Sequence, residues 1–189
     1  MTREVARKLI HLAAVAIPAF VWWAPAKLSL ALLAFGTAVA LLMEAARRWH
    51  RWSRYQFLRR TRHLLRPHER HGIAGATWMM ISFFLAFLIF PARVAVVAML
   101  YNGLGDAAAA LVGRRWGRHR IPSGKSWEGA GAAFIVNLAV GLMVPGIPPV
   151  AATLGAVAAA GLEFAPLPFD DNVRVTLGGG AALWLLALR

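Results

Sequence analysis

Cysteine is absent from this chain of 189 residues, which excludes disulfides, iron–sulfur clusters and thiolate zinc sites. Acidic residues are scarce: eight Asp and Glu stand against 21 Lys and Arg, so the formal net charge is +13. Internal repeats are also lacking, as are low-complexity tracts other than alanine-rich stretches. Apolar residues, in contrast, make up 59% of the chain, which is too many for an ordinary soluble domain.

The excess of positive charge raises the question of a nucleic-acid partner. The basic residues fall between apolar stretches, however, and no recognition motif or RNA-binding aromatic signature surrounds them. We therefore expect no nucleic-acid partner, and we interpret these residues as the cytoplasmic face of a membrane protein.

Seven apolar segments divide the chain, several of them shorter than the ~20 residues that a transmembrane helix needs. They cover Leu9–Ala24, Leu28–Met43, Ile73–Phe90, Val94–Val112, Ala130–Val144, Val150–Leu162 and Val173–Leu188. The pattern predicts an all-α polytopic integral membrane protein. We expect a compact, thin bundle of about seven transmembrane helices that forms a single membrane domain over residues 1–189.

The charges orient this bundle. With the N-terminus cytoplasmic, all basic residues except Lys27, Arg93 and Arg189 fall on the cytoplasmic side, as the positive-inside rule requires. All eight acids fall there too, although acids do not follow that rule, so they are either solvated loop ends or parts of a site. We expect a prokaryotic cytoplasmic membrane with the active site on its cytoplasmic side. Glu4, His11 and Pro25 argue against a cleaved signal peptide.

Residues 44–72 form the longest basic loop. Trp49, Trp52 and Phe57 stand among its arginines, which predicts an amphipathic helix lying on anionic lipid or, with equal weight, a bulky cytoplasmic loop.

The stretch 105–129 carries the strongest chemical signal. Asp106 ends an apolar segment, where a carboxylate is costly unless it binds a cation or a proton, and a basic glycine-rich loop follows. Gly124-Lys125-Ser126 resembles the end of a P-loop, but His119 stands where that motif requires glycine. What remains is a looser phosphate cradle. The expected members of this cradle are Gly105, Gly113, Arg114, Gly117, Arg120, Gly124, Lys125, Ser126 and Gly129. Glu128, beside the cradle, is a further catalytic candidate.

A second acidic stretch covers residues 163–172. Glu163, Asp170 and Asp171 supply carboxylates and Asn172 an amide oxygen, which suits Mg²⁺ bound together with substrate phosphates. Capping of the last helix explains one of these residues but not all of them.

The N-terminal segment adds a polar helix face. Arg7, Lys8 and His11 lie three or four residues apart, and His11 either contacts a substrate headgroup or bonds a neighbouring helix. Glu69, before the third apolar segment, likewise either takes part in function or belongs to a stretch that packs helices together.

Together these blocks resemble the CTP-dependent lipid kinase family that includes dolichol kinase, phytol kinase and the yeast-type diacylglycerol kinase. The resemblance rests on four blocks: Glu4 to Lys8 with His11 and Pro18, Arg66 to Thr77, Gly105 to Gly129, and Glu163 to Asn172. It implies transfer of the CTP γ-phosphoryl group to a membrane lipid alcohol (polyprenol or dolichol, phytol or diacylglycerol), with Mg²⁺ and CTP bound.

The resemblance also implies roles for single residues. Asp106 with Asp170 or Asp171 would hold Mg²⁺, with Glu163 a further metal candidate, and one of the aspartates would take the alcohol proton. Lys125 and the loop arginines would neutralise charge, and Glu128 would position Lys125 or bind metal. The substrate candidates are Arg7, Lys8, His11 and Glu69.

Two alternatives stay open. The stretch 105–129 also resembles phosphatidate cytidylyltransferases (CDP-diacylglycerol synthases), but this chain has Asp170-Asp171-Asn172 where those enzymes carry a Lys-Asp signature. A small transporter would need polar residues at mid-membrane depth, where Asn137 is the main candidate. A homodimer is also possible.

Overall fold

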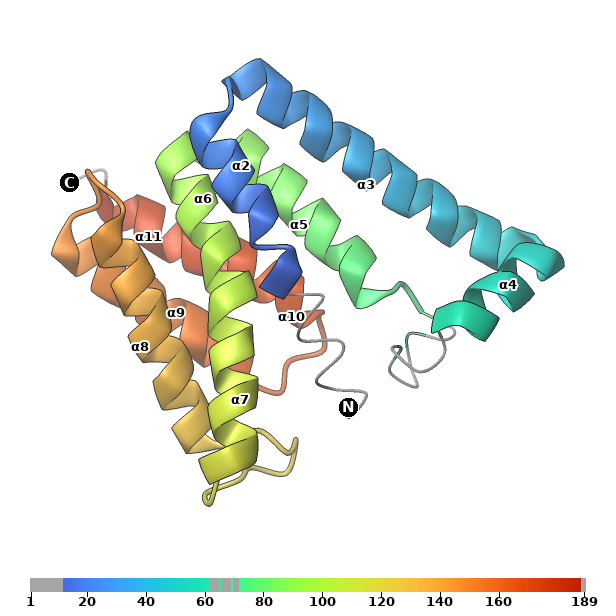
Figure 1. Ribbon diagram of the computed structural model, residues 1–189. Helices are drawn as coiled ribbons and strands as arrows, with labels where there is room; N and C mark the ends of the chain where they lie inside the picture. The colour runs from blue at the N-terminus through green and yellow to red at the C-terminus, as the bar shows by residue number, and fades with distance from the viewer. Residues whose placement is uncertain (1–11, 62–64, 66–68, 70–71, 188–189) are drawn as a thin grey trace.

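The computed structural model describes residues 12–61, 65, 69 and 72–187. Within these residues the chain is all-helical and contains no strand, which confirms the predicted all-α class. Helical segments run up and down in alternation (Figure 1). They are α2 (Ala16–Trp23), α3 (Ala26–Trp49), α5 (Gly75–Ile89), the continuous α6–η2–α7 (Ala92–Leu100, Tyr101–Gly105, Asp106–Trp116), α8 (Trp127–Met143), α9 (Pro149–Phe164) and α10–η3–α11 (Asp171–Val173, Arg174–Gly178, Gly179–Ala187).

Prolines mark three of the helix starts. Pro25 and Pro91 are the N-caps of α3 and α6, and Pro148 caps α9, which has Pro149 at its first position. Proline lacks an N–H and fixes φ near the helical value, so it is tolerated where a helix begins. These turns lie at the end of the molecule that also carries the C-terminus of α11 (Figure 1).

The centre of the bundle is α6. Val94 to Met99 are all buried, and the core cluster around them includes Tyr101 from η2, which continues α6, and Phe83 and Leu183 from neighbouring helices. A helix buried on every side belongs to the interior of the bundle.

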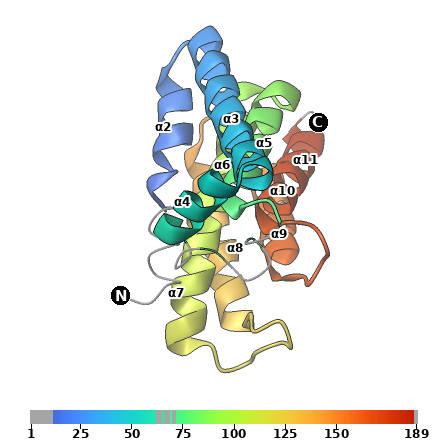
Figure 2. The same ribbon diagram turned by 90° about the vertical axis from the view of Figure 1, so that its right-hand side faces the viewer.

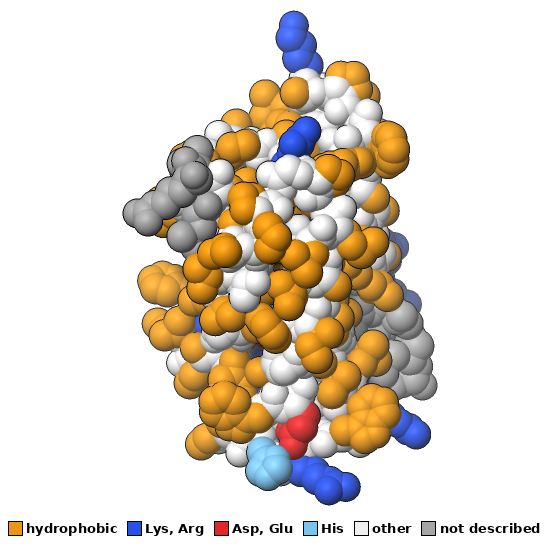
Figure 3. Space-filling view, turned by 90° about the vertical axis from the view of Figure 1, so that its left-hand side faces the viewer, with side chains coloured by type: hydrophobic (Ala, Val, Ile, Leu, Met, Phe, Trp, Pro, Cys, Tyr) orange, Lys and Arg blue, Asp and Glu red, His pale blue; other side chains and the backbone are white. Residues whose placement is uncertain are grey.

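In the part of the chain that the structure describes, two helices are long and apolar enough to cross a membrane, as judged by length and composition: α3 with 24 residues, and the continuous segment Ala92–Trp116 with 25. Outward-facing apolar side chains are frequent; Trp23, Phe35 and Leu42 are each more than two-thirds exposed. Figure 3 shows one such apolar face, with acidic, histidine and basic side chains gathered at its lower end. The number of spans and the orientation of the N-terminus stay predictions.

Two π-helical segments interrupt the helices beside the predicted acids. η2 ends directly before Asp106, and η3 begins after Val173. The Asn102 amide of η2 donates to Thr176 Oγ1 of η3 at 3.0 Å, so the two segments are joined. Single π turns inside α-helices are frequent at functional sites.

The basic loop contains α4 (Arg51–Thr61), a helix with no buried residue. Its Trp52 and Tyr55 are largely exposed, while Phe57 packs under the Arg47 guanidinium, 5.1 Å from ring centroid to Cζ. A helix is therefore present in the segment for which the sequence predicted either an amphipathic helix or a loop. Contact of α4 with lipid stays a prediction.

Candidate functional site

A pocket of about 260 Å³ opens between α7, α8 and the end of α9. Figures 1 and 2 both place the α7–α8 loop that borders it at the end of the molecule opposite the C-terminus. The pocket lining includes several of the site residues predicted from the sequence: Asp106, Gly113, Arg114, Arg120, Gly124, Lys125, Ser126, Gly129 and Glu163. Residues 105–129 and Glu163 therefore contribute to one site.

The α7–α8 loop is closed by a tight turn. Gly124 N–H donates to Ile121 O at 2.8 Å across Pro122, and Gly124 has φ +84°, a backbone conformation that favours glycine. The Arg120 guanidinium donates to Gly124 O at 2.9 Å and to Gly113 O at 2.7 Å. Arg120 thus fixes the shape of the pocket rim in addition to lining the pocket.

Close contact between α7 and α8 explains several of the glycines. Ser126 caps α8 by accepting a hydrogen bond from Gly129 N–H at 3.1 Å. A Cβ at Gly113 would lie 2.9 Å from Ser126 Oγ, and one at Gly117 would lie 2.7 Å from it. A Cβ at Gly129 would lie 2.7 Å from Ala109 O. These glycines allow the two helices to approach each other, which gives the pocket a rigid wall.

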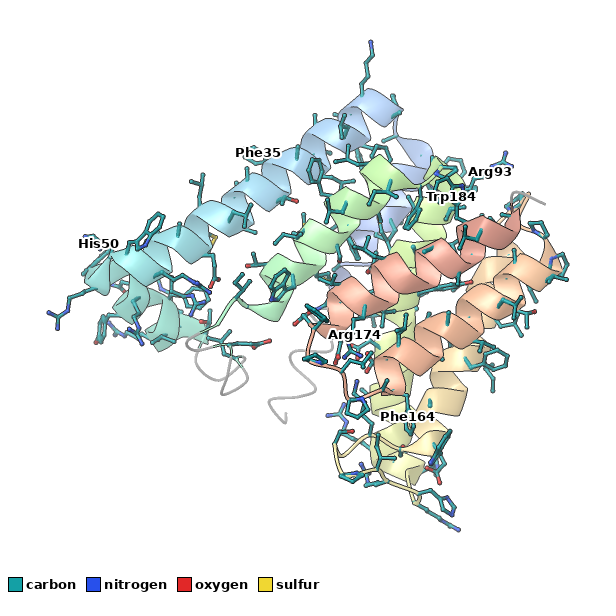
Figure 4. All side chains as sticks on the ribbon, turned by 180° about the vertical axis from the view of Figure 1, so that it is seen from behind. Phe35, His50, Arg93, Phe164, Arg174 and Trp184 are labelled. Atoms are coloured by element: carbon teal, nitrogen blue, oxygen red, sulfur yellow. The ribbon has the colours of Figure 1, made fainter. Side chains whose placement is uncertain are left out.

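Lys125 connects the loop to the acidic stretch. Its ammonium lies 3.0 Å from Glu163 Oε1 and 3.2 Å from Asp171 Oδ2, and it also donates to Glu163 O. Arg174 holds the other carboxylate oxygen of Asp171 and donates to Leu162 O at 2.6 Å. Arg174 also donates to Ala165 O at 2.9 Å, one residue after Phe164, which lies below Arg174 in Figure 4. A continuous ionic chain therefore runs from the loop to the junction of α9 and α10.

The four carboxylates expected at a metal have different positions. Asp106, the first residue of α7, and Glu163 line the pocket, and Asp171 reaches it through Lys125. Asp170 Oδ1 instead accepts from the Asn172 backbone N–H at 3.0 Å, so it caps α10. Within the described residues, no three His, Asp or Glu side chains are close enough together to hold a metal ion. The two carboxylates that line the pocket are a set that fits Mg²⁺, which is commonly bound by one or two carboxylates plus substrate phosphates.

Glu128, in the first turn of α8, lies outside the pocket lining. Its carboxylate accepts from His119 N–H at 3.2 Å, and Oε1 is 2.7 Å from the His119 ring Nδ1. Its own backbone N–H and the His119 ring lower the pKa of the exposed Glu128 carboxyl to about 2. The structure thus shows Glu128 closing the loop through His119, and it shows no contact between Glu128 and Lys125.

Asn172 and Glu69 join the start of α10 to the start of α5. The buried Asn172 amide donates to Gly75 O at 3.2 Å and to Asp170 Oδ1 at 2.8 Å. Glu69, also buried, accepts from Gly75 N–H at 3.2 Å. Both residues therefore hold helix ends together beside the acidic stretch.

The remaining predicted residues are placed as follows. Gly105 precedes Asp106 and lies against Asn137, because a Cβ there would be 2.5 Å from Asn137 Oδ1. Arg114 lines the pocket, with its Nε donating to Ala110 O at 3.2 Å. Arg7, Lys8 and His11 lie outside the described residues.

Sequence reasoning missed three parts of the site. Ser123 and Phe164 line the pocket, and Arg174 holds Asp171. The signal for Arg174 was present, since it lies three residues after Asp171 on a helix and can form an ion pair along it.

A protein of Rickettsia prowazekii, named uncharacterized protein RP860, is 30% identical over 145 residues, which are 75% of this chain and 70% of the relative. The chain belongs to the same family as this rickettsial protein. No family model and no solved structure matches.

Members of two kinase groups are similar to part of the chain. The CTP-dependent diacylglycerol kinase 1 of Schizosaccharomyces pombe is 32% identical over 77 residues, 40% of this chain and 35% of the kinase. The phytol kinase of Synechocystis is 39% identical over 102 residues, 48% of this chain and 43% of the kinase. The matches thus span less than half of either kinase, and they support a relation to lipid kinases.

Proposed function

We propose that this protein is an integral membrane enzyme that transfers the γ-phosphoryl group of CTP to the hydroxyl of a lipid alcohol. One observation carries the proposal: Lys125 lies between Glu163 and Asp171 in a pocket that Asp106 also lines. The partial similarity to kinases of diacylglycerol and phytol supports CTP as donor and a lipid as acceptor.

The pocket has the chemistry that a triphosphate needs. Arg114, Arg120 and Lys125 line it together with the turn at Gly124. Guanidinium and ammonium groups bind phosphate oxygens through charge-assisted hydrogen bonds, and a compact glycine turn lets the backbone approach them. Held by Glu163 and Asp171, the Lys125 ammonium is fixed in place before a nucleotide arrives, which reduces the cost of ordering it.

The reaction needs positioning more than covalent help. The lipid hydroxyl oxygen forms a bond to the γ-phosphorus, the bond from that phosphorus to the β–γ bridging oxygen breaks, and CDP leaves. Asp171, which lies beside Lys125 and outside the lining of this pocket, would take the hydroxyl proton. Mg²⁺, held by Asp106 and Glu163 together with phosphate oxygens, would neutralise charge on the phosphates.

The apolar surface and the two long helices support the membrane setting. Seven spans with a cytoplasmic N-terminus would place the α7–α8 loop and the acidic stretch on the cytoplasmic side, where CTP is available. The alkyl chain of the substrate would then stay in the bilayer while its hydroxyl reaches the site.

A panel assay tests the proposal. Purified protein in detergent is offered a polyprenol, phytol and diacylglycerol with each of the four γ-labelled nucleoside triphosphates and Mg²⁺. We expect labelled lipid with CTP, and loss of labelling in Asp106→Asn while that variant keeps its far-UV circular dichroism. Full activity of Asp106→Asn would remove Asp106 from the site.

A further inference from the structure

A second pocket, of about 600 Å³, lies beside the first, between the start of α5 and the segment before α10. Its apolar lining includes Ile73 and Trp78 on one wall and Leu167 and Phe169 on the other. Asp170 and Asp171 are its acidic members. The pocket therefore combines an apolar surface with a carboxylate end.

The two walls are tied together by buried hydrogen bonds. Asn172, which adjoins the acidic wall, donates to Gly75 O, and Gly75 N–H donates to Glu69. Arg47, buried and paired with Glu44, donates to Glu69 O at 3.2 Å and to Gly72 O at 2.5 Å. Buried polar groups that are hydrogen-bonded in this way hold one geometry, so the pocket is preformed.

The two pockets meet at one ion pair. Asp171 lines the second pocket, and its Oδ2 lies 3.2 Å from the ammonium of Lys125, which lines the first. A hydroxyl next to Asp171 would therefore lie on one side of the ion pair, and a phosphate bound by Lys125 on the other. Such a placement brings the two substrates to the same ion pair, and direct transfer further requires the hydroxyl oxygen to come within about 3–3.5 Å of the γ-phosphorus.

The apolar mouth indicates the kind of occupant. Leu167 is 48% exposed and Phe169 is 74% exposed, so this wall is apolar from the pocket to the molecular surface. An amphiphile with one polar end fits a pocket with an apolar mouth and a carboxylate end, because its chain can contact Phe169 and Trp78 while its hydroxyl donates to a carboxylate.

We infer that the second pocket is the acceptor site, in which a lipid alcohol binds with its hydroxyl at Asp171 and its chain along Trp78 and Phe169. This inference rests on the proposed function for the reaction, but the binding itself can be measured without it.

The first experiment measures binding alone. Full-length protein in mixed micelles without nucleotide is irradiated with a diazirine-bearing phytol or a diazirine-bearing diacylglycerol, and the labelled peptides are identified by mass spectrometry. We expect at least one probe to label residues 73–78 or 167–173, and excess unlabelled phytol or diacylglycerol to reduce that labelling. The methyl ether of the same alcohol, which has no hydroxyl to donate, should compete less well.

The second experiment uses a matched pair of variants. Phe169→Ala removes an exposed aromatic side chain at the pocket mouth, and Phe35→Ala removes one of similar exposure, 69%, from α3 (Figure 4). We expect Phe169→Ala to raise KM for the lipid alcohol roughly fivefold, from the lost apolar contact, and to leave KM for CTP within about twofold. Phe35→Ala should change neither constant.

The results separate the two claims. Labelling of the second pocket without phosphorylation of any alcohol would refute the proposed kinase and keep the lipid-alcohol site. Phosphorylation with labelling only elsewhere, and with KM unchanged in Phe169→Ala, would overturn the acceptor site and keep the kinase. No labelling by either probe would also overturn the acceptor site.

Discussion

Replacing Lys125 with methionine separates the structural role of this residue from its chemical role. The substitution keeps most of the side-chain volume and removes the ammonium that lies 3.0 Å from Glu163 Oε1 and 3.2 Å from Asp171 Oδ2. Breaking a fully buried ion pair costs about 3–5 kcal/mol and an exposed pair contributes less than about 1 kcal/mol. The three side chains are 27%, 11% and 24% exposed, so we expect a loss between these limits, about 2 kcal/mol of unfolding free energy.

For a protein of this size, that loss corresponds to a fall in Tm of about 4–8 °C. The effect on activity should be larger, because a positioned cation acts on charge that develops during phosphoryl transfer: we expect a loss of about 10²-fold or more in kcat. Lys27→Met, at an exposed position at the start of α3, is the matched control and should change neither quantity.

The double variant Lys125→Met with Glu163→Gln decides between the roles. Removing the acid that Lys125 neutralises should recover most of the Tm, because an uncharged pair costs less to bury, while activity stays low. Tm would be followed by tryptophan fluorescence in detergent, and activity by lipid labelling from γ-labelled CTP. Because Glu163 is itself a proposed Mg²⁺ ligand, activity is compared with that of Glu163→Gln alone: if the double variant were as active as this single variant, Lys125 would serve only to hold the fold, and the assignment to phosphate binding would be refuted.

Three further predictions follow from the geometry. Gly129→Ala should lower the unfolding free energy by about 1–3 kcal/mol, since its Cβ would meet Ala109 O at 2.7 Å. The control Gly131→Ala, on the same helix, places a Cβ that meets nothing within 4 Å and should be neutral or stabilising. Equal Tm values for the two variants would contradict the close packing of α7 on α8. Glu128→Gln weakens the contact that closes the loop at His119 and leaves the pocket lining unchanged, so kcat should fall less than about tenfold, far less than in Asp106→Asn. Equal losses of kcat in the two variants would show that Glu128 takes part in the reaction. Chelation by EDTA should abolish lipid labelling and added Mg²⁺ should restore it, and activity that persists in EDTA would exclude the proposed metal.

Several elements of the fold could be predicted because their signals are local. Pro25, Pro91 and Pro148 stand at helix starts, and the apolar segments between such breaks are the observed helices. Asp106 lines the pocket with Ala109, Ala110 and Gly113 from α7, and the loop that follows α7 adds Lys125 to the same pocket.

Other parts depend on contacts between distant segments. The pairing of Lys125 with Glu163 joins positions 38 residues apart, and nothing in either stretch specifies it. Gly113 and Gly117 are predicted members of the phosphate cradle, and the structure shows that they also make room for Ser126, a role that depends on the approach of α8. The π turn before Asp106 has no sequence signal that we recognise, and the second pocket appears only once residues 72–78 meet residues 167–173.

The central claim is that the γ-phosphoryl group of CTP, and not the cytidylyl group, is transferred to lipid. CTP carrying one isotope at the α-phosphorus and another at the γ-phosphorus measures this directly in a single reaction with the purified protein, Mg²⁺ and either a lipid alcohol or phosphatidate. We predict γ-label in the product of the alcohol, CDP as the released nucleotide, and no α-label in lipid. Transfer of α-label to phosphatidate with release of pyrophosphate would contradict the account and make the protein a cytidylyltransferase.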